Sequence, residues 1–286
     1  MGGPMSPESQ ASNSQSPTVA FIGGGNMARS LIGGMVARGA APDSIRVAEP
    51  VDALRQSLRS EFGVATFTTA AEAVEGASVW LFAVKPQVMR SVCNAMTEQA
   101  QAHPPLAISV AAGITSGQLS HWLGGGMAVV RAMPNTPALL GAGITGLFAN
   151  QPTTSTQREQ AATLLGAVGP TVWVEDEAQM DAVTAVSGSG PAYVFLLAEA
   201  MQAAGVAQGL PEQTARALAS QTLLGASRML VESEQPAAEL RRQVTSPNGT
   251  THAAIETFQA GGFEALVAKA VAAAAVRGRE LSAAND

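Results

Sequence analysis

The sequence predicts a doubly wound α/β domain followed by an all-α domain. Strand-like and helix-like segments alternate from Thr18 to about Val174, which is typical of a mostly parallel sheet covered on both faces. After Glu175 the strand signals nearly vanish, and helical patterns continue to the end of the chain. The expected division is a disordered tail at 1–17, the α/β domain at 18–175 and the all-helical domain at 176–286.

The first predicted strand leads directly into a glycine-rich turn, Gly23-Gly24-Gly25-Asn26-Met27-Ala28, and the residues through Arg38 form a helical pattern. In such a turn, Gly23 permits the tight bend, Gly25 leaves room for a pyrophosphate, and Ala28 lets the helix pack closely on its strand. The N–H groups at the helix N-terminus then face the phosphates. The turn therefore indicates a Rossmann-type dinucleotide-binding domain, although similar turns also occur as plain structure.

The remaining elements follow from the hydrophobic pattern. Strands are predicted at 19–22, 45–49, 64–67, 79–83, 106–110, 128–133, 144–149 and 171–174. Helices between them are predicted at 51–62, 70–75, 86–101 and 155–168, and later ones at 237–244, 250–260 and 263–281.

The middle of the helical part is unusually apolar. Residues 181–231 contain only five charged side chains. Pro191 and Pro211 stand where a proline can open a helix, and the segments after them are apolar on nearly every face. Because such helices need burial on all sides, the simplest arrangement is a homodimer with interlocked helical domains. A compact monomeric bundle is the alternative.

Composition excludes several classes of protein. The net charge is −6, and Lys85 and Lys269 are the only lysines, so no basic face is available for nucleic acid. The single Cys93 excludes an internal disulfide and suits a reducing compartment. Residues 1–17 contain no Lys or Arg, unlike a secretory or transit signal. No apolar run reaches the roughly 18 residues that span a bilayer. We expect a cytoplasmic protein without membrane or nucleic-acid partners.

Polar residues follow several strands at the carboxyl edge of the predicted sheet, where open α/β sheets bind ligands. Glu49 ends the second strand, where an acid commonly binds the adenosine ribose and favours a free 2′-hydroxyl; the alternative is a solvated strand end. Arg46 and Arg55 are close enough in sequence to compensate its charge. Lys85 follows the fourth strand and is presented at this edge by Pro86. It is expected to contact the cofactor or an anionic substrate, and the alternative is that it contacts only solvent.

Two later strands also end in candidate ligand contacts. Small residues at 109–113 leave space beside a flat nicotinamide. Asn135 stands between two prolines that restrict its neighbours, so its side chain either contacts the cofactor or closes a turn. No metal site is expected, because His103, His121 and His252 are scattered without ligand spacing.

The helical part offers a second candidate site. The polar turn from Ser246 to Thr251 opens a helix, and its N–H groups can bind a carboxylate; an ordinary helix start is the alternative. Glu234 faces either a cationic substrate nitrogen or solvent. The segment Ser187-Gly188-Ser189-Gly190 lacks the setting of a nucleophile elbow, so a tight helix–helix contact is predicted there.

Together these separated motifs resemble pyrroline-5-carboxylate reductase over about residues 18–281. They are FIGGGNM at 21–27, AVKP at 83–86, AAGIT at 111–115, MPNTP at 133–137, SGSGPAY at 187–193 and VTSPNGTT at 244–251. The resemblance implies a Rossmann domain and an all-helical domain that forms an interlocked dimer, often the building block of a ring of dimers.

The resemblance also implies roles for individual residues. NADPH or NADH is expected to contact Ile22, Gly23, Gly24, Gly25, Asn26, Met27, Glu49, Ala83, Val84, Lys85, Pro86, Val110, Ala111 and Ala112. The substrate carboxylate is expected on Ser246, Gly249, Thr250 and Thr251, in a site shared between subunits.

Two positions depart from the pattern of the family. Glu49 stands where NADPH-preferring relatives tend to have a small or basic residue, which makes NADH use plausible. Asn248 replaces a glycine, and because asparagine tolerates a left-handed backbone the turn should persist.

The implied reaction is hydride transfer from nicotinamide C4 to C5 of a cyclic imine, which yields L-proline in the last step of proline biosynthesis. A protonated imine is already electrophilic, so no strong protein acid is needed. Thr251 is expected to orient the ring, with Glu234 near its nitrogen and Lys85 beside the nicotinamide. A β-hydroxyacid dehydrogenase is the enzymatic alternative, although Val194 stands where that chemistry needs a lysine. A second alternative, from another class of protein, is a redox sensor that binds NAD(P)H without turnover.

Overall fold

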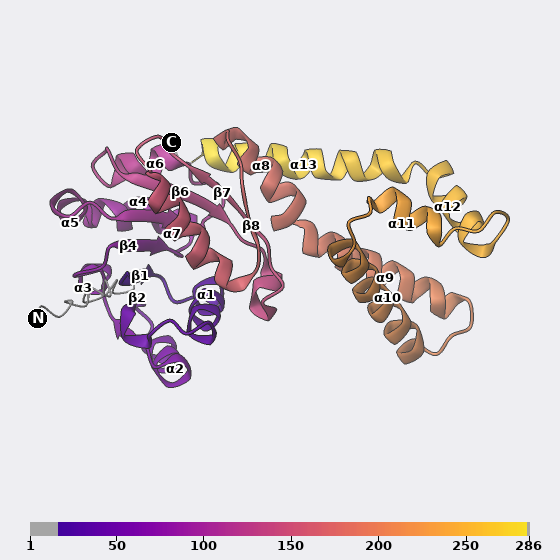
Figure 1. The fold of residues 1–286 in the computed structure, drawn as a ribbon, viewed down its shortest axis with the longest axis horizontal. Helices are drawn as coiled ribbons and strands as arrows, with labels where there is room; N and C mark the ends of the chain where they lie inside the picture. The colour runs from indigo at the N-terminus through magenta and orange to yellow at the C-terminus, as the bar shows by residue number, and fades with distance from the viewer. Residues whose placement is uncertain (1–16, 285–286) are drawn as a thin grey trace, which may run out of the picture.

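An eight-stranded sheet forms the first part of the chain, and the second part is helical throughout (Figure 1). The computed structural model describes residues 17–284, so the predicted tail lies outside these residues except for Pro17. The strands are β1 (Val19–Ile22), β2 (Ile45–Ala48), β3 (Ala65–Phe67), β4 (Val79–Phe82), β5 (Leu106–Ser109), β6 (Ala128–Met133), β7 (Thr145–Ala149) and β8 (Thr171–Trp173).

Helices cover the sheet and then continue beyond it. Those of the first part are α1 (Asn26–Ala37), α2 (Asp52–Phe62), α3 (Ala70–Val74), α4 (Pro86–Ala95), α5 (Thr97–Ala102), α6 (Ser116–Trp122) and α7 (Ser155–Leu165). Those of the second part are α8 (Met180–Val183), a π-helical turn η5 (Thr184–Gly188), α9 (Gly190–Ala207), α10 (Glu212–Glu232), α11 (Ala237–Gln243), α12 (Thr250–Ala260) and α13 (Phe263–Ala283). Short 3-10 turns are η1 (Pro42–Ser44), η2 (Thr136–Leu140), η3 (Gly166–Val168) and η4 (Glu177–Gln179).

The sheet has the strand order β3-β2-β1-β4-β5-β6-β7-β8. All neighbouring pairs are parallel except β6 and β7, which are antiparallel. The chain adds β2 and β3 on one side of β1 and then adds β4 to β8 on its other side, so the topological switch point lies between β1 and β4. In open α/β sheets, ligands bind outside the carboxyl ends of the strands at such a switch point.

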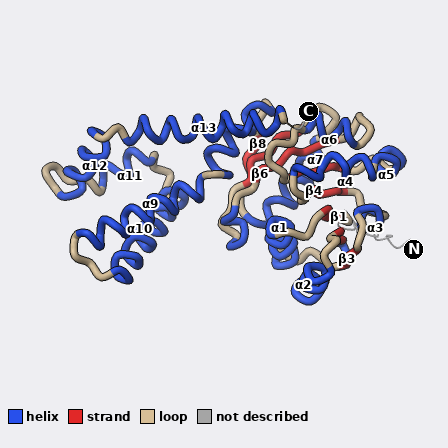
Figure 2. Tube along the Cα trace, turned by 180° about the vertical axis from the view of Figure 1, so that it is seen from behind, coloured by secondary structure: helices blue, strands red, loops and turns tan. Residues whose placement is uncertain are grey.

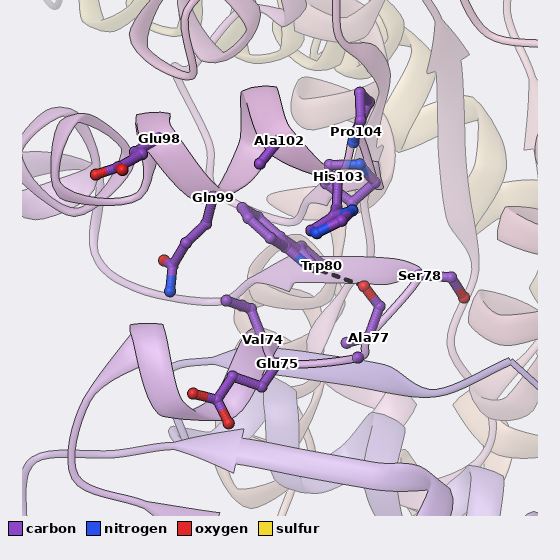
Figure 3. Close-up of a pocket in the computed structure, with 12 residues that line it drawn as sticks. Val74, Glu75, Ala77, Ser78, Trp80, Glu98, Gln99, Ala102, His103 and Pro104 are labelled. Atoms are coloured by element: carbon purple, nitrogen blue, oxygen red, sulfur yellow. Dashed lines mark hydrogen bonds between the residues drawn. The ribbon is translucent and has the colours of Figure 1, made fainter.

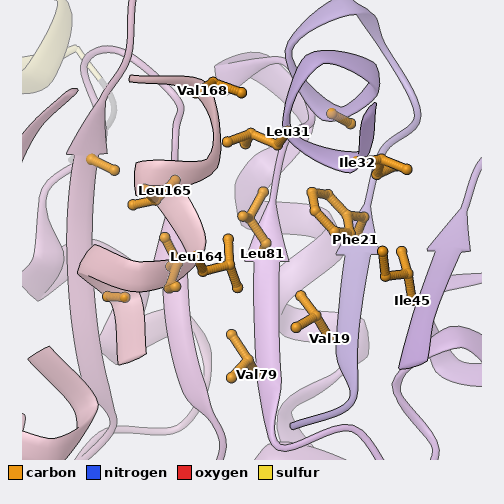
Figure 4. Packing of buried hydrophobic residues seen from close by; sticks show 14 of the residues in the cluster. Val19, Phe21, Leu31, Ile32, Ile45, Val79, Leu81, Leu164, Leu165 and Val168 are labelled. Carbon is orange, nitrogen blue, oxygen red and sulfur yellow. The ribbon is translucent and has the colours of Figure 1, made fainter. Parts of the chain in front are cut away.

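Both faces of the sheet are buried, as the strand pattern predicted. Val19 and Phe21 of β1 point into a core with α1, α2 and α7 (Figure 4). Their neighbours Ala20 and Ile22 point into the opposite core, which α4, α5 and α6 cover. Because successive side chains of a strand point to opposite faces, a continuous apolar run is what a doubly covered strand requires.

The predicted strands are confirmed to within one residue at either end, and three helical details differ. The helix predicted at 155–168 ends as α7 at Leu165 and is followed by the 3-10 turn η3. The helix predicted at 86–101 is two helices, because the chain leaves helical geometry at the buried Met96, where φ is −109° and ψ is 3°. Helix α6 was not predicted individually. It begins with a capping box, in which the Thr115 side chain accepts from the Gln118 N–H and the Gln118 side chain accepts in return from the Thr115 N–H.

The π-helical turn around Gly188 packs against α13, so the predicted helix contact is present. The glycine itself approaches the end of β6, because a Cβ on Gly188 would lie 2.6 Å from Cε of Met133. The Tyr193 hydroxyl donates to the carbonyl of Ala185 at 2.9 Å in the same turn. Glycine spacing alone did not reveal the approach to β6.

Helices α9, α10, α11, α12 and the first part of α13 form an arm that projects away from the sheet (Figures 1 and 2). The last turns of α13 return to the sheet. There Nε2 of Gln118 donates to the carbonyl of Ser282 at 3.1 Å, and a Cβ on Gly113 would lie 3.1 Å from Cβ of Leu281. The arm is thus connected to the sheet by α8 and η5 on the way out and by α13 on the way back.

The arm buries very little apolar surface within one chain. Ala215 and Ala219 are the only buried residues in helices α9 to α13. Phe195, Leu196 and Leu266 remain about two thirds exposed. This is not the compact monomeric bundle that the sequence left open, and an exposed apolar surface of this size marks an interaction site.

Among the described residues, no single helix has the length and apolar character to cross a bilayer. Helices α12 and α13 satisfy the length and composition criteria only as a pair, and they are bent by 54° relative to each other.

Candidate active site

The glycine turn lies at the switch point and is fixed against the end of β4. Gly23 has a φ of +103°, and a Cβ there would lie only 2.8 Å from the carbonyl oxygen of Ala83. The Gly23 N–H donates to the carbonyl of Ala48 at 2.9 Å, and the Ala83 N–H donates to that of Ile22 at 2.8 Å. The predicted tight turn is confirmed, and it joins the ends of β1, β2 and β4.

No side chain caps the N–H groups at the start of α1. Its N-cap is Gly25, whose extended backbone carries no side-chain cap, and the first turn contains no acidic residue. A Cβ on Gly25 would meet no atom within 4 Å, so the backbone borders open space, whereas Ala28 is fully buried. The N–H groups of a helix N-terminus attract anions, and this arrangement fits the pyrophosphate of a dinucleotide.

Glu49 is not a solvated strand end. Its side chain is buried, with the residue only 7% exposed. Oε2 accepts a hydrogen bond from the Gly24 N–H at 3.0 Å, and Oε1 accepts one from the Val51 N–H at 2.9 Å. The carboxylate therefore links the glycine turn to the start of α2, beside the position where an adenosine ribose binds in this fold.

The remaining predicted cofactor contacts surround the same edge. Lys85 is the exposed N-cap of α4, and the following Pro86 fixes its extended backbone. Val110 and Ala112 are half-buried after β5, and the Ala111 N–H donates to the Ser109 hydroxyl at 3.3 Å.

Asn135 has the turn-closing contacts that the sequence left open as an alternative. Its Oδ1 accepts from the Ile144 N–H at 3.0 Å, and its Nδ2 donates to the carbonyl of Ser187 at 3.2 Å. The side chain thus joins the end of β6 to the π-helical turn. A contact with the cofactor stays a prediction.

The second predicted site lies at the start of α12. Asn248 has a φ of +60° and is the only non-glycine residue in the described chain with positive φ, as expected for asparagine in place of glycine. The Gly249 N–H donates to the Ser246 carbonyl at 3.0 Å, so Gly249 shapes the turn rather than offering its own N–H. No side chain caps the helix, which leaves the N–H groups of Thr250 and Thr251 to face a ligand.

Within one chain the two predicted sites are far apart. The glycine turn lies at the sheet, whereas α11 and α12 lie in the arm (Figures 1 and 2). Glu234 is exposed in the loop between α10 and α11, also in the arm. A single chain therefore does not bring Thr251 to the glycine turn.

Sequence reasoning missed a charged cluster where the arm leaves the sheet. Glu177 accepts from the N–H and from the hydroxyl of Ser116, both at 2.6 Å, and pairs with Arg131 at 3.5 Å. Asp181 Oδ1 lies 3.9 Å from the other guanidinium nitrogen. The available signal was Arg131 itself, a single cation in the middle of the apolar strand β6.

A groove of about 820 Å³ lies elsewhere. It is bordered by Val74, Trp80, Gln99 and His103 at the amino ends of β4 and β5 (Figure 3). None of the predicted site residues lines it. Within residues 17–284, no group of three or more His, Cys, Asp or Glu side chains is arranged to hold a metal ion.

Comparisons with known proteins agree with this geometry. A family described as pyrroline-5-carboxylate reductase dimerisation matches residues 177–281, and one described as NADP oxidoreductase coenzyme F420-dependent matches residues 18–113. The chain is 53% identical to a pyrroline-5-carboxylate reductase of Pseudomonas aeruginosa over 266 residues, which cover 93% of this chain and 97% of that one. It is 42% identical to a reductase of the same name from Arabidopsis thaliana, with coverage of 92% and 95%.

Solved structures are similar over the full architecture, including the arm. A pyrroline-5-carboxylate reductase from Coxiella burnetii has a TM-score of 0.91 at 41% identity, and the match covers 94% of this chain and 99% of that one. A pyrroline carboxylate reductase from Plasmodium falciparum, solved with NADP bound, has a TM-score of 0.81 at 27% identity, with coverage of 93% and 98%. With the Rossmann-type edge and the helical arm in place, these likenesses show that the chain belongs to the pyrroline-5-carboxylate reductase family.

Proposed function

We propose that this protein reduces 1-pyrroline-5-carboxylate to L-proline with a hydride from NAD(P)H. One observation carries the assignment of the site: α1 at the switch point of the sheet and α12 in the arm both begin at a glycine with an extended backbone, and neither has a side-chain cap or an acidic residue in its first turn. The first fits a pyrophosphate and the second a carboxylate. The family to which the chain belongs supports the reaction.

The protein's role at the sheet edge is to hold the dinucleotide. NAD(P)H supplies the hydride when bound. Gly23 and Gly25 bring the backbone close to the pyrophosphate, and the amides of Asn26 and Met27 face it at the start of α1. Val110, Ala111 and Ala112 border the nicotinamide with small side chains, and Lys85 lies at the rim of the same edge.

The arm binds and orients the imine. The N–H groups of Thr250 and Thr251 donate hydrogen bonds to the substrate carboxylate, and the left-handed turn at Asn248 supports their position. The Thr251 hydroxyl orients the ring, and Glu234 stabilises the positive charge on its nitrogen. Because a protonated imine is already electrophilic, the site needs positioning and electrostatics rather than a strong acid.

The two halves come together in a homodimer. The arm exposes its apolar helices and carries the substrate turn, whereas the glycine turn stays with the sheet of each chain. An interlocked dimer buries the helices and places the Thr251 turn of one chain over the nicotinamide edge of the other. We further propose that dimers assemble into a ring and that the enzyme works in the reducing cytoplasm.

The reaction is tested with purified protein by following NADH and NADPH oxidation in the presence of pyrroline-5-carboxylate. Turnover that depends on the imine is expected with at least one cofactor. Binding of NAD(P)H without turnover would instead indicate a redox sensor. Oxidation of a β-hydroxyacid would indicate a dehydrogenase, although Val194 offers that reaction no base.

Thr251→Ala tests the substrate turn. The variant loses the hydroxyl that orients the ring, so the KM for the imine should rise about tenfold, which corresponds to about 1.4 kcal/mol, while the Kd for NADH stays unchanged. Thr257→Ala is the matched control, because its hydroxyl donates to the Ala253 carbonyl further along the same helix. An unchanged KM in Thr251→Ala would remove this residue from the site.

A further inference from the structure

The end of β2 is unusually well fixed for a strand end. Glu49 is almost completely buried, and each of its carboxylate oxygens accepts one backbone N–H, from Gly24 and from Val51. A Cβ on Gly24 would lie 2.8 Å from Cδ1 of Leu58 and 3.2 Å from Cβ of Glu49. The glycine turn, Glu49 and the start of α2 are therefore packed into one unit.

Arg55 is the cation closest to Glu49 in sequence on α2, and its guanidinium is already engaged. Nη1 donates to the carbonyls of Glu49 and Pro50, at 2.7 and 2.8 Å, and Nη2 donates to the Asp52 carboxylate at 2.9 Å. The side chain thus holds the backbone at the strand end. Three of the five N–H donors of Arg55 are therefore engaged with protein acceptors.

The arginines of the neighbouring elements are engaged as well. Arg46 donates to the carbonyls of Ala73 and Glu72, both at 2.7 Å, and lies over the ring of Phe67 at 4.2 Å. Arg29 on α1 pairs with Glu61 and donates to the Ser57 hydroxyl at 3.1 Å. Both guanidinium groups are therefore directed to protein partners.

The last arginine of α2, Arg59, is in the final turn of the helix. It is one helical turn beyond Arg55 in sequence. Among the described residues, neither Arg46 nor Arg55 pairs with the Glu49 carboxylate: Arg55 contacts only the backbone carbonyl of Glu49, and Arg46 is directed to the carbonyls of Ala73 and Glu72. The carboxylate therefore keeps its own hydrogen-bond acceptors directed at the ribose position.

We propose that Glu49 makes this enzyme selective for NADH over NADPH. A carboxylate only accepts hydrogen bonds, so it matches the 2′-hydroxyl of an adenosine ribose, which donates one. A 2′-phosphate also only accepts and carries like charge, and a buried carboxylate repels it with little screening by salt. The inference rests on the proposed function only in placing the dinucleotide at the glycine turn.

The inference is tested by direct binding, independently of turnover. The Kd values of NADH and NADPH are measured by fluorescence titration of the full-length protein. The native chain is expected to bind NADH at least about tenfold more tightly, which corresponds to about 1.4 kcal/mol. Glu49→Gln removes the carboxylate charge and keeps the side-chain size, but its amide nitrogen replaces one oxygen that accepts a backbone N–H. This loss acts on both dinucleotides, so the ratio of the two Kd values should still fall about fivefold or more because the repulsion of NADPH is gone.

Glu75→Gln is the matched control. It removes the same charge from an exposed residue at the opposite edge of the sheet, beside the groove of Figure 3, and should leave the ratio unchanged. Binding of 5′-AMP and 2′,5′-ADP to the native protein isolates the ribose contact, and 5′-AMP should bind more tightly.

Two results would overturn the role of Glu49. One is equal or tighter binding of NADPH and 2′,5′-ADP by the native chain, which requires no variant to fold. The other is a native ratio that persists in Glu49→Gln. Selective NADH binding without imine turnover would contradict the proposed reaction and leave the selectivity intact, whereas imine turnover with unselective binding would contradict only the selectivity.

Discussion

At the scale of single residues, the backbone of Gly23 is the most constrained part of the cofactor edge. Its φ of +103° disfavours any side chain, and the Ala83 carbonyl occupies the space where a Cβ would lie. Both restrictions act at the point where β1, β2 and β4 meet. Substitution at this position therefore strains the structure and closes the turn against the cofactor.

Gly23→Ala should lower the free energy of unfolding by at least about 1–3 kcal/mol and weaken NADH binding at least tenfold, because strain and a steric clash coincide. Gly39→Ala is the control: it has a similar φ of +91°, but a Cβ there would meet no atom within 4 Å. Urea unfolding and fluorescence titration measure the two effects. A loss of cofactor affinity in Gly39→Ala equal to that in Gly23→Ala would contradict the argument.

The sequence located several residues of the site but not their hydrogen bonds. Glu49 was predicted at the ribose position from its distance to the glycine turn, yet its bonds to Gly24 and Val51 depend on how α2 packs. Asn248 was predicted correctly in detail because a left-handed conformation is a local property of the residue. The partners of Asn135 are 9 and 52 residues away in sequence, and no local pattern reveals them.

At the scale of elements, the junction between the sheet and the arm depends on Glu177. This side chain, at the start of η4, connects Ser116 at the start of α6 with Arg131 in β6. Three segments that are distant in the sequence are therefore joined at one carboxylate. Arg131 is only 5% exposed, and a buried guanidinium requires such partners.

Glu177→Gln should lower the free energy of unfolding by about 1–3 kcal/mol, because the amide nitrogen would face donors where an oxygen accepted. Glu175→Gln removes the same charge from an exposed neighbour and should change stability by less than about 0.5 kcal/mol. Chemical denaturation of both variants measures the difference. Similar stabilities would show that the cluster does not hold the junction.

Elements whose pattern is local were the ones that the sequence predicted well. The strands have continuous apolar runs bounded by turn residues, and α12 was predicted at its observed bounds because the turn before it is polar. The break at Met96 was missed because residues 87–101 contain no proline or glycine to mark it. There Thr97 donates to the carbonyl of Trp122 at 3.0 Å, a tertiary contact that no local rule contains.

At the scale of the whole molecule, the exposed face of the arm fits the proposed homodimer. Leu196 is 66% exposed on α9, beside an apolar groove of about 480 Å³ between α9 and α13. Burying apolar side chains of this size stabilises an association by about 1.5–3 kcal/mol each. The all-round apolar character of α9 in the sequence indicated this need, although it did not show how the helices are arranged.

Leu196→Glu should shift the protein towards monomers and abolish imine turnover, while each sheet still binds NADH. This combination follows because the glycine turn is complete within one chain, whereas the Thr251 turn is expected to act on its partner. Val88→Glu, on the 45% exposed Val88 of α4, is the control. Light scattering, NADH titration and circular dichroism are the measurements. Full turnover by a monomeric variant would show that one chain forms the whole site.

Helix α13 sets how the two parts of the molecule can move. With a rise of about 1.5 Å per residue, its 21 residues form a rod of about 32 Å that starts in the arm and ends against Gly113. A swivel at the junction after β8 would have to bend this rod or detach Leu281 from Gly113. The arm and the sheet are therefore not free to move independently, and a displacement of the arm would also displace the loop of small residues after β5.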